Sequence, residues 1–140
     1  MIAITRSLLA TICRNAEAAY PDECCGLLLG REDGAGGIEI SRIAPSANLA
    51  ADRRRRFEID PALYFTLMRA PPGAAERLVG LYHSHPDGEA VPSAHDAAAA
   101  WEAGWIWLIV PVARGRSGEA AAHRLAAPGG PFEAVPLMLR

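Results

Sequence analysis

Two histidines separated by a single residue, His83 and His85, are the side chains of this sequence best suited to bind a metal ion. They lie in the segment Leu-Tyr-His-Ser-His-Pro, which is typical of a strand, and side chains two residues apart project from the same face of a strand. Asp96, eleven residues after His85, can add a carboxylate oxygen from the next element. Two imidazoles and one carboxylate leave a fourth tetrahedral position open, which is typical of a catalytic rather than a structural zinc site.

Each part of this pattern also has a simpler interpretation. A His-x-His pair on a strand can be a satisfied polar pair that binds no ion. Ser93 and Asp96 have the spacing of a capping box, in which the serine accepts from a backbone N–H at the start of a helix and the acid reciprocates. Pro92 and the alanines that follow Asp96 suit a helix start. Neither part alone decides between these interpretations.

A third part of the pattern lies upstream. Glu23 immediately precedes the apolar run Cys-Cys-Gly-Leu-Leu-Leu-Gly, which is typical of a strand buried on both faces. With Glu23 included, the sequence contains Glu … His-x-His-x7-Ser-x-x-Asp, and this pattern resembles the signature of the JAMM (MPN-domain) metalloprotease family. Every position of the signature is filled and both fixed gaps are kept. The resemblance covers roughly residues 1–110.

The resemblance implies a fold, a cofactor and residue roles. The fold is α/β, a mixed β-sheet with helices packed on it, of the MPN (cytidine-deaminase-like) type. The cofactor is Zn²⁺, bound by His83, His85 and Asp96. Glu23 is expected to act as the general acid–base that carries a proton to the leaving amine, and Ser93 to donate a hydrogen bond to the oxyanion. A solvated corner position for Glu23 and a helix cap for Ser93 are the alternatives.

The resemblance also implies an activity and a partner. Family members cleave the bond after the C-terminal glycine of a ubiquitin-like protein, and the compact stand-alone prokaryotic type is associated with small sulfur carriers. We therefore expect a zinc metallopeptidase or isopeptidase whose partner has a flexible Gly-Gly tail, bound as an extra strand at a sheet edge beside the zinc. A non-catalytic MPN-type scaffold is the alternative, although such members have lost ligands. A zinc deaminase is disfavoured because that chemistry needs His-x-Glu and Pro-Cys-x-x-Cys.

Composition narrows the remaining possibilities. We expect a single domain over residues 1–140, because this length supports one core. A formal net charge of −2 gives no electrostatic reason to expect a nucleic acid partner. No apolar run has the roughly 20 residues of a membrane span, and three cysteines, two of them adjacent, suit no disulfide framework, so we expect a cytoplasmic protein away from membranes. Four arginines at positions 53–56 are expected in a solvated loop, or on a surface for an acidic partner.

Periodicity and turn residues divide the chain into alternating strands and helices. Helices are expected over residues 5–20, 61–70 and 93–103, the second with Pro61 as its first residue and a stop at residues 70–73. The N-terminal strand is expected at a sheet edge, and edge strands at both termini would allow a homodimer. Strands are expected at residues 1–4, 24–29 (closed by Gly30), 38–43 (antiparallel to the preceding strand), 57–59, 78–85, 105–112, 119–125 and 132–139.

Four further polar residues lie close to the pattern or downstream of it. His95 is one residue from Asp96 and therefore turned about 100° away on a helix, so we expect it at the surface or behind the ligands. Asp87 and Glu89 lie in the loop between the histidines and Ser93, and are expected to face solvent or the substrate groove. No role is predicted for His123.

Overall fold

The computed structural model describes residues 1–71 and 73–140, and within them nine strands form one mixed β-sheet. The strands are β1 (Ile2–Ile4), β2 (Cys25–Glu32), β3 (Ile38–Ser46), β4 (Arg77–Pro86), β5 (Ile106–Ala113), β6 (Arg116–Ser117), β7 (Ala121–Leu125), β8 (Phe132–Val135) and β9 (Leu137–Leu139). Their order across the sheet is β8-β7-β5-β4-β2-β3-β1-β9, and β6 pairs with β5. Because β4 pairs antiparallel with β2 and parallel with β5, the predicted mixed sheet is confirmed.

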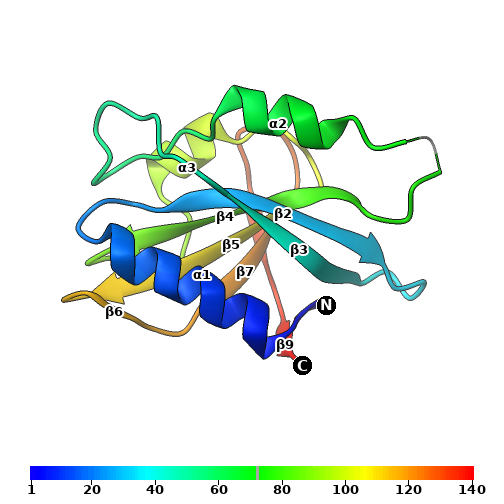
Figure 1. Ribbon diagram of the computed structural model, residues 1–140, viewed down its shortest axis with the longest axis horizontal. Coiled ribbons are helices and arrows are strands. Elements are labelled where there is room, and N and C mark those ends of the chain that lie inside the picture. Colours follow the sequence, from blue (N-terminus) through cyan, green and yellow to red (C-terminus); the bar gives the residue numbers. More distant parts are fainter. Residues whose placement is uncertain (72) are drawn as a thin grey trace.

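The two faces of the sheet are covered by different helices (Figure 1). The long helix α1 (Arg6–Ala19) lies on one face, and the short helices α2 (Pro61–Met68) and α3 (Ala94–Ala99) lie on the other. Helix α1 begins at Thr5, whose hydroxyl accepts a hydrogen bond from the Leu8 N–H at 3.1 Å. Its buried residues Ile12 and Ala16 pack into the larger of two apolar clusters. The smaller cluster, on the α2/α3 face, is built on Leu27, Leu81, Ala100, Trp107 and Leu125.

Strand β4 contributes to both faces. Successive side chains of a strand point to opposite sides of the sheet. Tyr82 therefore belongs to the cluster under α1, whereas Leu81 belongs to the cluster on the α2/α3 face. His83 and His85 follow Leu81 at the same spacing, so the strand that anchors the core also delivers both histidines to the α2/α3 face.

Strand β2 runs further than the sequence predicts. The prediction that Gly30 ends this strand is wrong, because pairing with β3 continues to Glu32 after a register shift between Leu29 and Gly30. A Cβ atom at Gly30 would lie 2.5 Å from the Glu39 carbonyl oxygen. Glycine is therefore needed here for the close approach of two strands, rather than for a turn. The antiparallel pairing of β2 with β3 is confirmed.

Both ends of the chain lie side by side in a way the sequence does not indicate. The prediction of an N-terminal edge strand is wrong, since β1 lies between β3 and β9 and is parallel to both. The prediction of one strand over residues 132–139 is also wrong. The chain breaks at Pro136, so that β8 pairs with β7 while β9 crosses to β1 at the opposite edge. The sheet edges are β8 and β9, and pairing between copies through them stays a prediction.

Two further segments differ from expectation. Helix α3 ends after Ala99 rather than near residue 103, because Ala100 adopts extended backbone angles and packs into the smaller cluster at 2% exposure. Residues 57–59 form no strand within the described chain, and a hydrogen-bonded loop holds them instead. Helix α2 begins at Pro61 after the Asp60 cap, as predicted, and the Pro72 part of its predicted stop lies outside the described residues.

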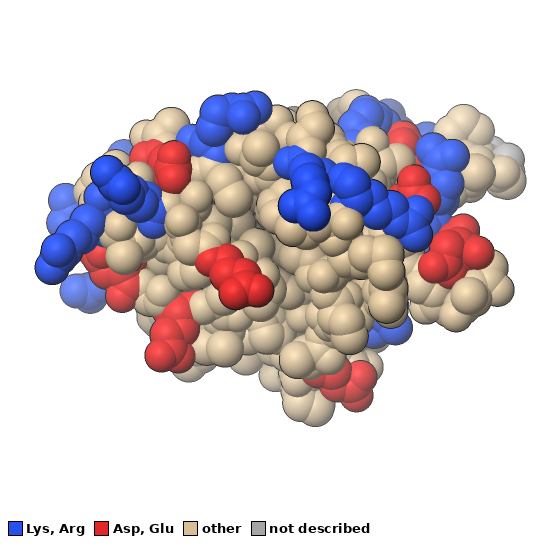
Figure 2. Space-filling view, turned by 90° about the horizontal axis from the view of Figure 1, so that it is seen from below, with Lys and Arg blue, Asp and Glu red and all other residues tan. Residues whose placement is uncertain are grey.

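The surface carries charges of both signs. Basic and acidic side chains are interspersed over the face drawn in Figure 2. The four arginines at positions 53–56 are exposed, as expected for a surface loop. No helix among residues 1–71 and 73–140 is long and apolar enough to cross a membrane.

Candidate metal centre and active site

The two histidines of the motif and Asp96 converge on one position. The Nε2 atoms of His83 and His85 lie 2.9 Å apart. Each also lies close to Oδ2 of Asp96, at 3.1 Å for His83 and 3.0 Å for His85. His83 is fully buried and Asp96 is almost so. Three ligand-type atoms from β4 and the first turn of α3 are therefore held within hydrogen-bond distance of one another, two of them on buried side chains and the third on the partly exposed His85.

A capping box places Asp96 against the histidines. The Asp96 N–H donates to Oγ of Ser93 at 3.1 Å, and the Ser93 N–H donates to Oδ2 of Asp96 at 2.9 Å. This carboxylate oxygen is also the one that faces both imidazoles. The helix-start interpretation and the ligand interpretation of Ser-x-x-Asp are thus compatible in one arrangement. His95 points elsewhere and is exposed, as expected.

Glu23 lies beside the histidines and is buried, so the alternative of a solvated acid does not hold. One ligand-type atom from each of Glu23, His83 and His85 lies within 4.8 Å of the others. The backbone of Glu23 is fixed on both sides, because its N–H donates to the Arg53 carbonyl at 2.7 Å and its carbonyl accepts from Nδ2 of Asn48 at 3.0 Å. Burial raises the pKa of the Glu23 carboxyl to about 8, while His85 acts in the opposite direction.

The electrostatics of the cluster favour an ionised Asp96. Burial alone would raise the pKa of Asp96, but hydrogen bonds with His83 and His85 outweigh it and lower that pKa. Complete burial lowers the pKa of His83. Burial also acts to lower the pKa of His85, yet its hydrogen bonds with Asp96 and the Glu89 carbonyl raise it overall. In the metal-free protein the carboxylate is therefore stabilised by the imidazole N–H groups that a cation would replace.

The two histidines are oriented in different ways. Nδ1 of His85 donates to the Glu89 carbonyl at 2.7 Å, whereas Nδ1 of His83 has no partner among the described residues. His83 is instead held by aromatic rings: Phe57 stacks on it with centroids 4.4 Å apart, and Trp107 meets it edge-on at 5.6 Å. A hydrogen bond orients one imidazole and ring packing orients the other.

Sequence reasoning missed several residues that support this centre. Asn48 holds the Glu23 carbonyl with its amide nitrogen, while its amide oxygen accepts from the Glu58 N–H at 3.1 Å. It thereby fastens the loop that carries Phe57 to the strand end that carries Glu23. An asparagine in an irregular segment suggests only a local turn. Neither Asn48 nor Phe57 gives a signal of this role in the sequence alone.

The donor set fits a zinc ion. Imidazole and carboxylate ligands about 2.0–2.2 Å from tetrahedral zinc lie about 3.3 Å from each other. The observed separations of 2.9–3.1 Å need only a small opening of the cluster. In addition, Oε1 of Glu23 is buried with no hydrogen-bond partner among the described residues. Buried polar atoms are normally paired, so this oxygen indicates a polar group that the chain does not supply.

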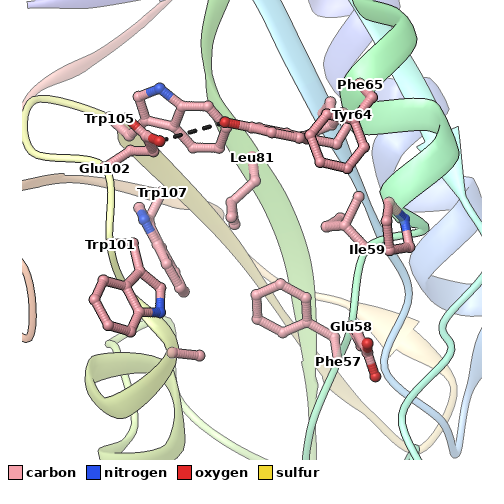
Figure 3. Close-up of a pocket in the computed structure, with 13 residues that line it drawn as sticks. Phe57, Glu58, Ile59, Tyr64, Phe65, Leu81, Trp101, Glu102, Trp105 and Trp107 are labelled. Carbon is pink, nitrogen blue, oxygen red and sulfur yellow. Dashed lines mark hydrogen bonds between the residues drawn. The ribbon is translucent and has the colours of Figure 1, made fainter. Parts of the chain in front are cut away.

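Two of the pockets near the centre bear on how a substrate could bind. A small one of about 230 Å³ is lined by Glu23, His85 and Ser93 together with Arg54 and Arg55 of the arginine run. A larger one of about 410 Å³ lies between α2, α3 and the sheet, with an aromatic lining that Figure 3 shows. The larger pocket reaches the metal centre through Phe57 and Trp107, which line it and also contact His83. Its lining includes Leu27, Phe57, Tyr64, Leu81, Trp101, Trp105 and Trp107, with the carboxylates of Glu58 and Glu102.

Residues 5–125 of the chain match the family described as prokaryotic homologs of the JAB domain. The chain belongs to this family. The match contains all five residues of the Glu … His-x-His … Ser-x-x-Asp pattern and runs from the start of α1 to the end of β7. This match confirms the resemblance to the JAMM family. The roles of the five residues stay predictions.

Known proteins of similar sequence or structure agree with this assignment. The desampylase of Haloferax volcanii is 35% identical over 103 residues, which are 74% of this chain and 72% of that protein. The CysO-cysteine peptidase of Mycobacterium tuberculosis is 32% identical over 111 residues, 79% and 73% of the two chains. A solved structure from Desulfitobacterium hafniense has a TM-score of 0.83 at 26% identity, covering 100% of this chain and 93% of that one. A JAB1/MPN domain protein from Archaeoglobus fulgidus, with a TM-score of 0.61 at 21% identity, covers 99% and 97% and confirms the MPN fold.

Proposed function

We propose that this hydrolase is a zinc-dependent peptidase or isopeptidase that cleaves the amide bond after the C-terminal glycine of a small ubiquitin-like or sulfur-carrier protein. The observation that carries the proposal is the convergence of His83 Nε2, His85 Nε2 and Asp96 Oδ2 within 3.1 Å of one another. The Glu23 carboxylate lies beside them. A protein-binding scaffold has no need for four ionisable side chains gathered in a buried position, so the complete set favours catalysis.

In this proposal His83, His85 and Asp96 would hold the zinc, and the zinc would supply Lewis-acid chemistry that lowers the pKa of a water towards about 7. Asp96 serves as a ligand in its ionised form, which the surrounding hydrogen bonds favour. The Glu89 carbonyl keeps the proton of His85 on Nδ1, so that its Nε2 presents a lone pair to the ion.

Glu23 is the proposed general acid–base. Its carboxylate oxygen lies within 4.8 Å of the imidazole nitrogens, close enough to share a substrate or water with them. Asn48 and Arg53 fix its backbone, so only the side-chain torsions of Glu23 remain to be set when the substrate binds. It can take the proton of the attacking water and pass it to the leaving amine, which is the usual task of a positioned carboxylate in amide hydrolysis.

Ser93 is the proposed oxyanion donor. Its oxygen accepts from the Asp96 N–H, and this leaves the hydroxyl hydrogen free to donate to another acceptor. Ser93 also lines the small pocket with Glu23 and His85, where a scissile carbonyl has to lie. A hydrogen bond to the developing oxyanion in such a site typically contributes about 3–4 kcal/mol to transition-state stabilisation.

The relatives and the larger pocket support the proposed substrate class. One relative is named a desampylase and another a CysO-cysteine peptidase, which supports a small carrier protein with something attached to its tail. A pocket of about 410 Å³ with an aromatic lining can take apolar side chains of the carrier that precede the cleaved bond. A single layer of rings, those of Phe57 and Trp107, lies between this pocket and His83. A few extended residues of the tail would therefore reach from the pocket to the metal centre.

The tail cannot add to the strand that carries the histidines. Strand β4 is flanked by β2 and β5, and the sheet edges are β8 and β9, so the expectation of a sheet edge beside the zinc is wrong. The loop of residues 54–59 is the main chain that borders both pockets instead. We therefore place the proposed Gly-Gly tail along this loop, where glycine allows the backbone to approach the ion closely.

Arginines next to the metal centre favour one class of leaving group over another. Arg54 and Arg55 line the small pocket next to Glu23 and Ser93. Two guanidinium groups there favour a leaving group that carries its own carboxylate, such as a free amino acid, over a lysine side chain of a protein, whose carboxyl group is part of a peptide bond. We therefore propose that carriers with a single amino acid or a short peptide after the glycine are cleaved faster than lysine-linked conjugates.

Cleavage of a defined substrate tests the proposed function. Zinc-loaded protein is incubated with a ubiquitin-like carrier extended by one cysteine after Gly-Gly, and the product mass is measured. We expect a loss of one cysteine, its suppression by a chelator, and its recovery when zinc is restored. A matched carrier ending in Gly-Ala before the cysteine should be cleaved far more slowly. Absence of cleavage for tail-extended and lysine-linked carriers alike, by protein that binds zinc, would contradict the proposal.

A further inference from the structure

The loop of residues 87–92 connects the histidine pair on β4 to Ser93 at the start of α3. Two imidazoles hold this loop by adjacent carbonyl groups. His85 donates from Nδ1 to the Glu89 carbonyl at 2.7 Å, and His123 donates from Nε2 to the Ala90 carbonyl at 2.9 Å. The second contact joins residues 33 positions apart and uses a side chain outside the ligand cluster.

His123 lies on the same face of the sheet as the metal centre. It is on β7, opposite Trp107 in the ladder, and Trp107 in turn is opposite Leu81 of β4. Residues in register on neighbouring strands project to the same side of the sheet. His123 is 7% exposed, so its hydrogen bond to Ala90 is shielded from water.

We propose that His123 is a positioning residue for the metal centre. By fixing the Ala90 carbonyl, it fixes the neighbouring Glu89 peptide group against Nδ1 of His85. Nδ1 of His85 is then held as the donor to the Glu89 carbonyl, and its Nε2 is turned towards Asp96 and the position of the ion.

The loop needs this second anchor for a physical reason. Gly88 at its start has no side chain to pack against a neighbour, and its N–H donates to the His85 carbonyl at 3.3 Å. Residue 87 is fixed, since its N–H donates to the Val112 carbonyl at 2.6 Å. Between residue 87 and Ser93, the hydrogen bonds from side chains to the described main chain are those to the Glu89 and Ala90 carbonyls. Loss of the Ala90 anchor frees the Glu89 peptide to turn, and the orientation of His85 is lost with it.

Zinc affinity tests the inference with two variants of His123 and one control. Partners that orient a metal-binding histidine are typically worth 10–100-fold in metal affinity. We expect His123→Leu to weaken zinc binding by about 10-fold or more, as measured by competition with a chromophoric chelator. His123→Gln keeps an N–H donor at similar reach and should restore most of the affinity. His95→Leu, an exposed histidine beside Asp96, should bind zinc like the unchanged protein.

A second measurement separates positioning from a general loss of structure. The Nδ1–H signal of His85 in NMR spectra of metal-free protein reports its hydrogen bond to the Glu89 carbonyl, which should be present in the unchanged protein and weakened or lost in His123→Leu. Equal zinc affinity and an unchanged His85 Nδ1–H signal in folded His123→Leu would overturn the inference, as would equal losses in the Leu and Gln variants. The choice of zinc rests on the proposed function. If the chain binds no zinc, that function fails, and the His85 Nδ1–H signal of the metal-free protein still decides the role of His123.

Discussion

The two faces of the β-sheet are built from the same strands but packed to different degrees. Under α1, side chains such as Ile12, Ala16 and Tyr82 complete a large apolar cluster. On the α2/α3 face the apolar cluster is smaller, and the buried residues beside it include Glu23 and Asp96. That face also borders the aromatic pocket of about 410 Å³.

This difference shows where the fold can accommodate chemistry. Strand β4 is buried on both faces, so its positions are rigid whichever way a side chain points. On the α1 face this rigidity serves stability, because the space is filled by the chain's own side chains. On the α2/α3 face the same rigidity holds ligand atoms at fixed distances and leaves space for an ion and a substrate. Substitutions on the two faces should therefore act on different measured quantities.

The largest effect on activity is expected for Glu23→Gln. The amide keeps the size of the side chain but cannot take up a proton, so kcat/KM on the tail-extended carrier should fall by about 10²–10⁴-fold. Zinc content should be unchanged, because Glu23 is not a proposed ligand. Glu17→Gln is the matched control on α1, where this exposed carboxylate accepts hydrogen bonds from Ser117. If Glu23→Gln is as active as the unchanged protein, Glu23 is not the general acid–base, and the α2/α3 face does not differ from the α1 face in the way proposed.

The largest effect on stability is expected on the opposite face, for Ile12→Ala. Ile12 is fully buried in the cluster under α1, and such truncations typically lower the free energy of unfolding by about 2–5 kcal/mol. Urea denaturation measures this loss. The kcat/KM of the folded variant should stay unchanged, since α1 contributes no side chain to the metal centre. A large fall in kcat/KM for protein shown to be folded would mean that the faces are coupled more closely than their packing indicates.

Helix caps on the two faces sharpen the comparison. Ser93 caps α3 and Thr5 caps α1, and each accepts a hydrogen bond at 3.1 Å. Replacing either residue with alanine should cost about 1 kcal/mol of stability. Only Ser93→Ala should also lower kcat, by about 10²–10³-fold, because the oxyanion loses its donor. Thermal denaturation and steady-state kinetics on both variants decide between the roles, and a kcat for Ser93→Ala equal to that for Thr5→Ala leaves Ser93 as a cap alone.

The sequence predicts the site residues better than it predicts their supports. His83 and His85 share a face because of strand periodicity, and Asp96 reaches them because a capping box fixes its rotamer, so local rules were sufficient for their placement. Phe57 and Asn48 meet the centre only through the folding of an irregular loop, which no periodicity describes.

The errors in the predicted fold have a common physical cause. Apolar runs indicate strands but not their neighbours, so the sequence placed β1 at an edge and joined β8 to β9. Pairing between distant segments decided both cases. Similarly, α3 was predicted too long because alanines favour a helix, whereas burial of Ala100 ends it early.

The smallest expected effect concerns substrate affinity and uses Trp101. This side chain lines the aromatic pocket on the α2/α3 face but is 76% exposed, so it contributes little to stability. If the carrier protein covers the pocket, Trp101→Ala should raise KM by about 5- to 30-fold, as for a buried aromatic at an interface, with kcat unchanged. Met138→Ala, an exposed apolar residue on the β9 edge, is the matched control. An unchanged KM for Trp101→Ala would show that the carrier reaches the zinc by another route, and a lower kcat would place Trp101 in the support of the centre instead.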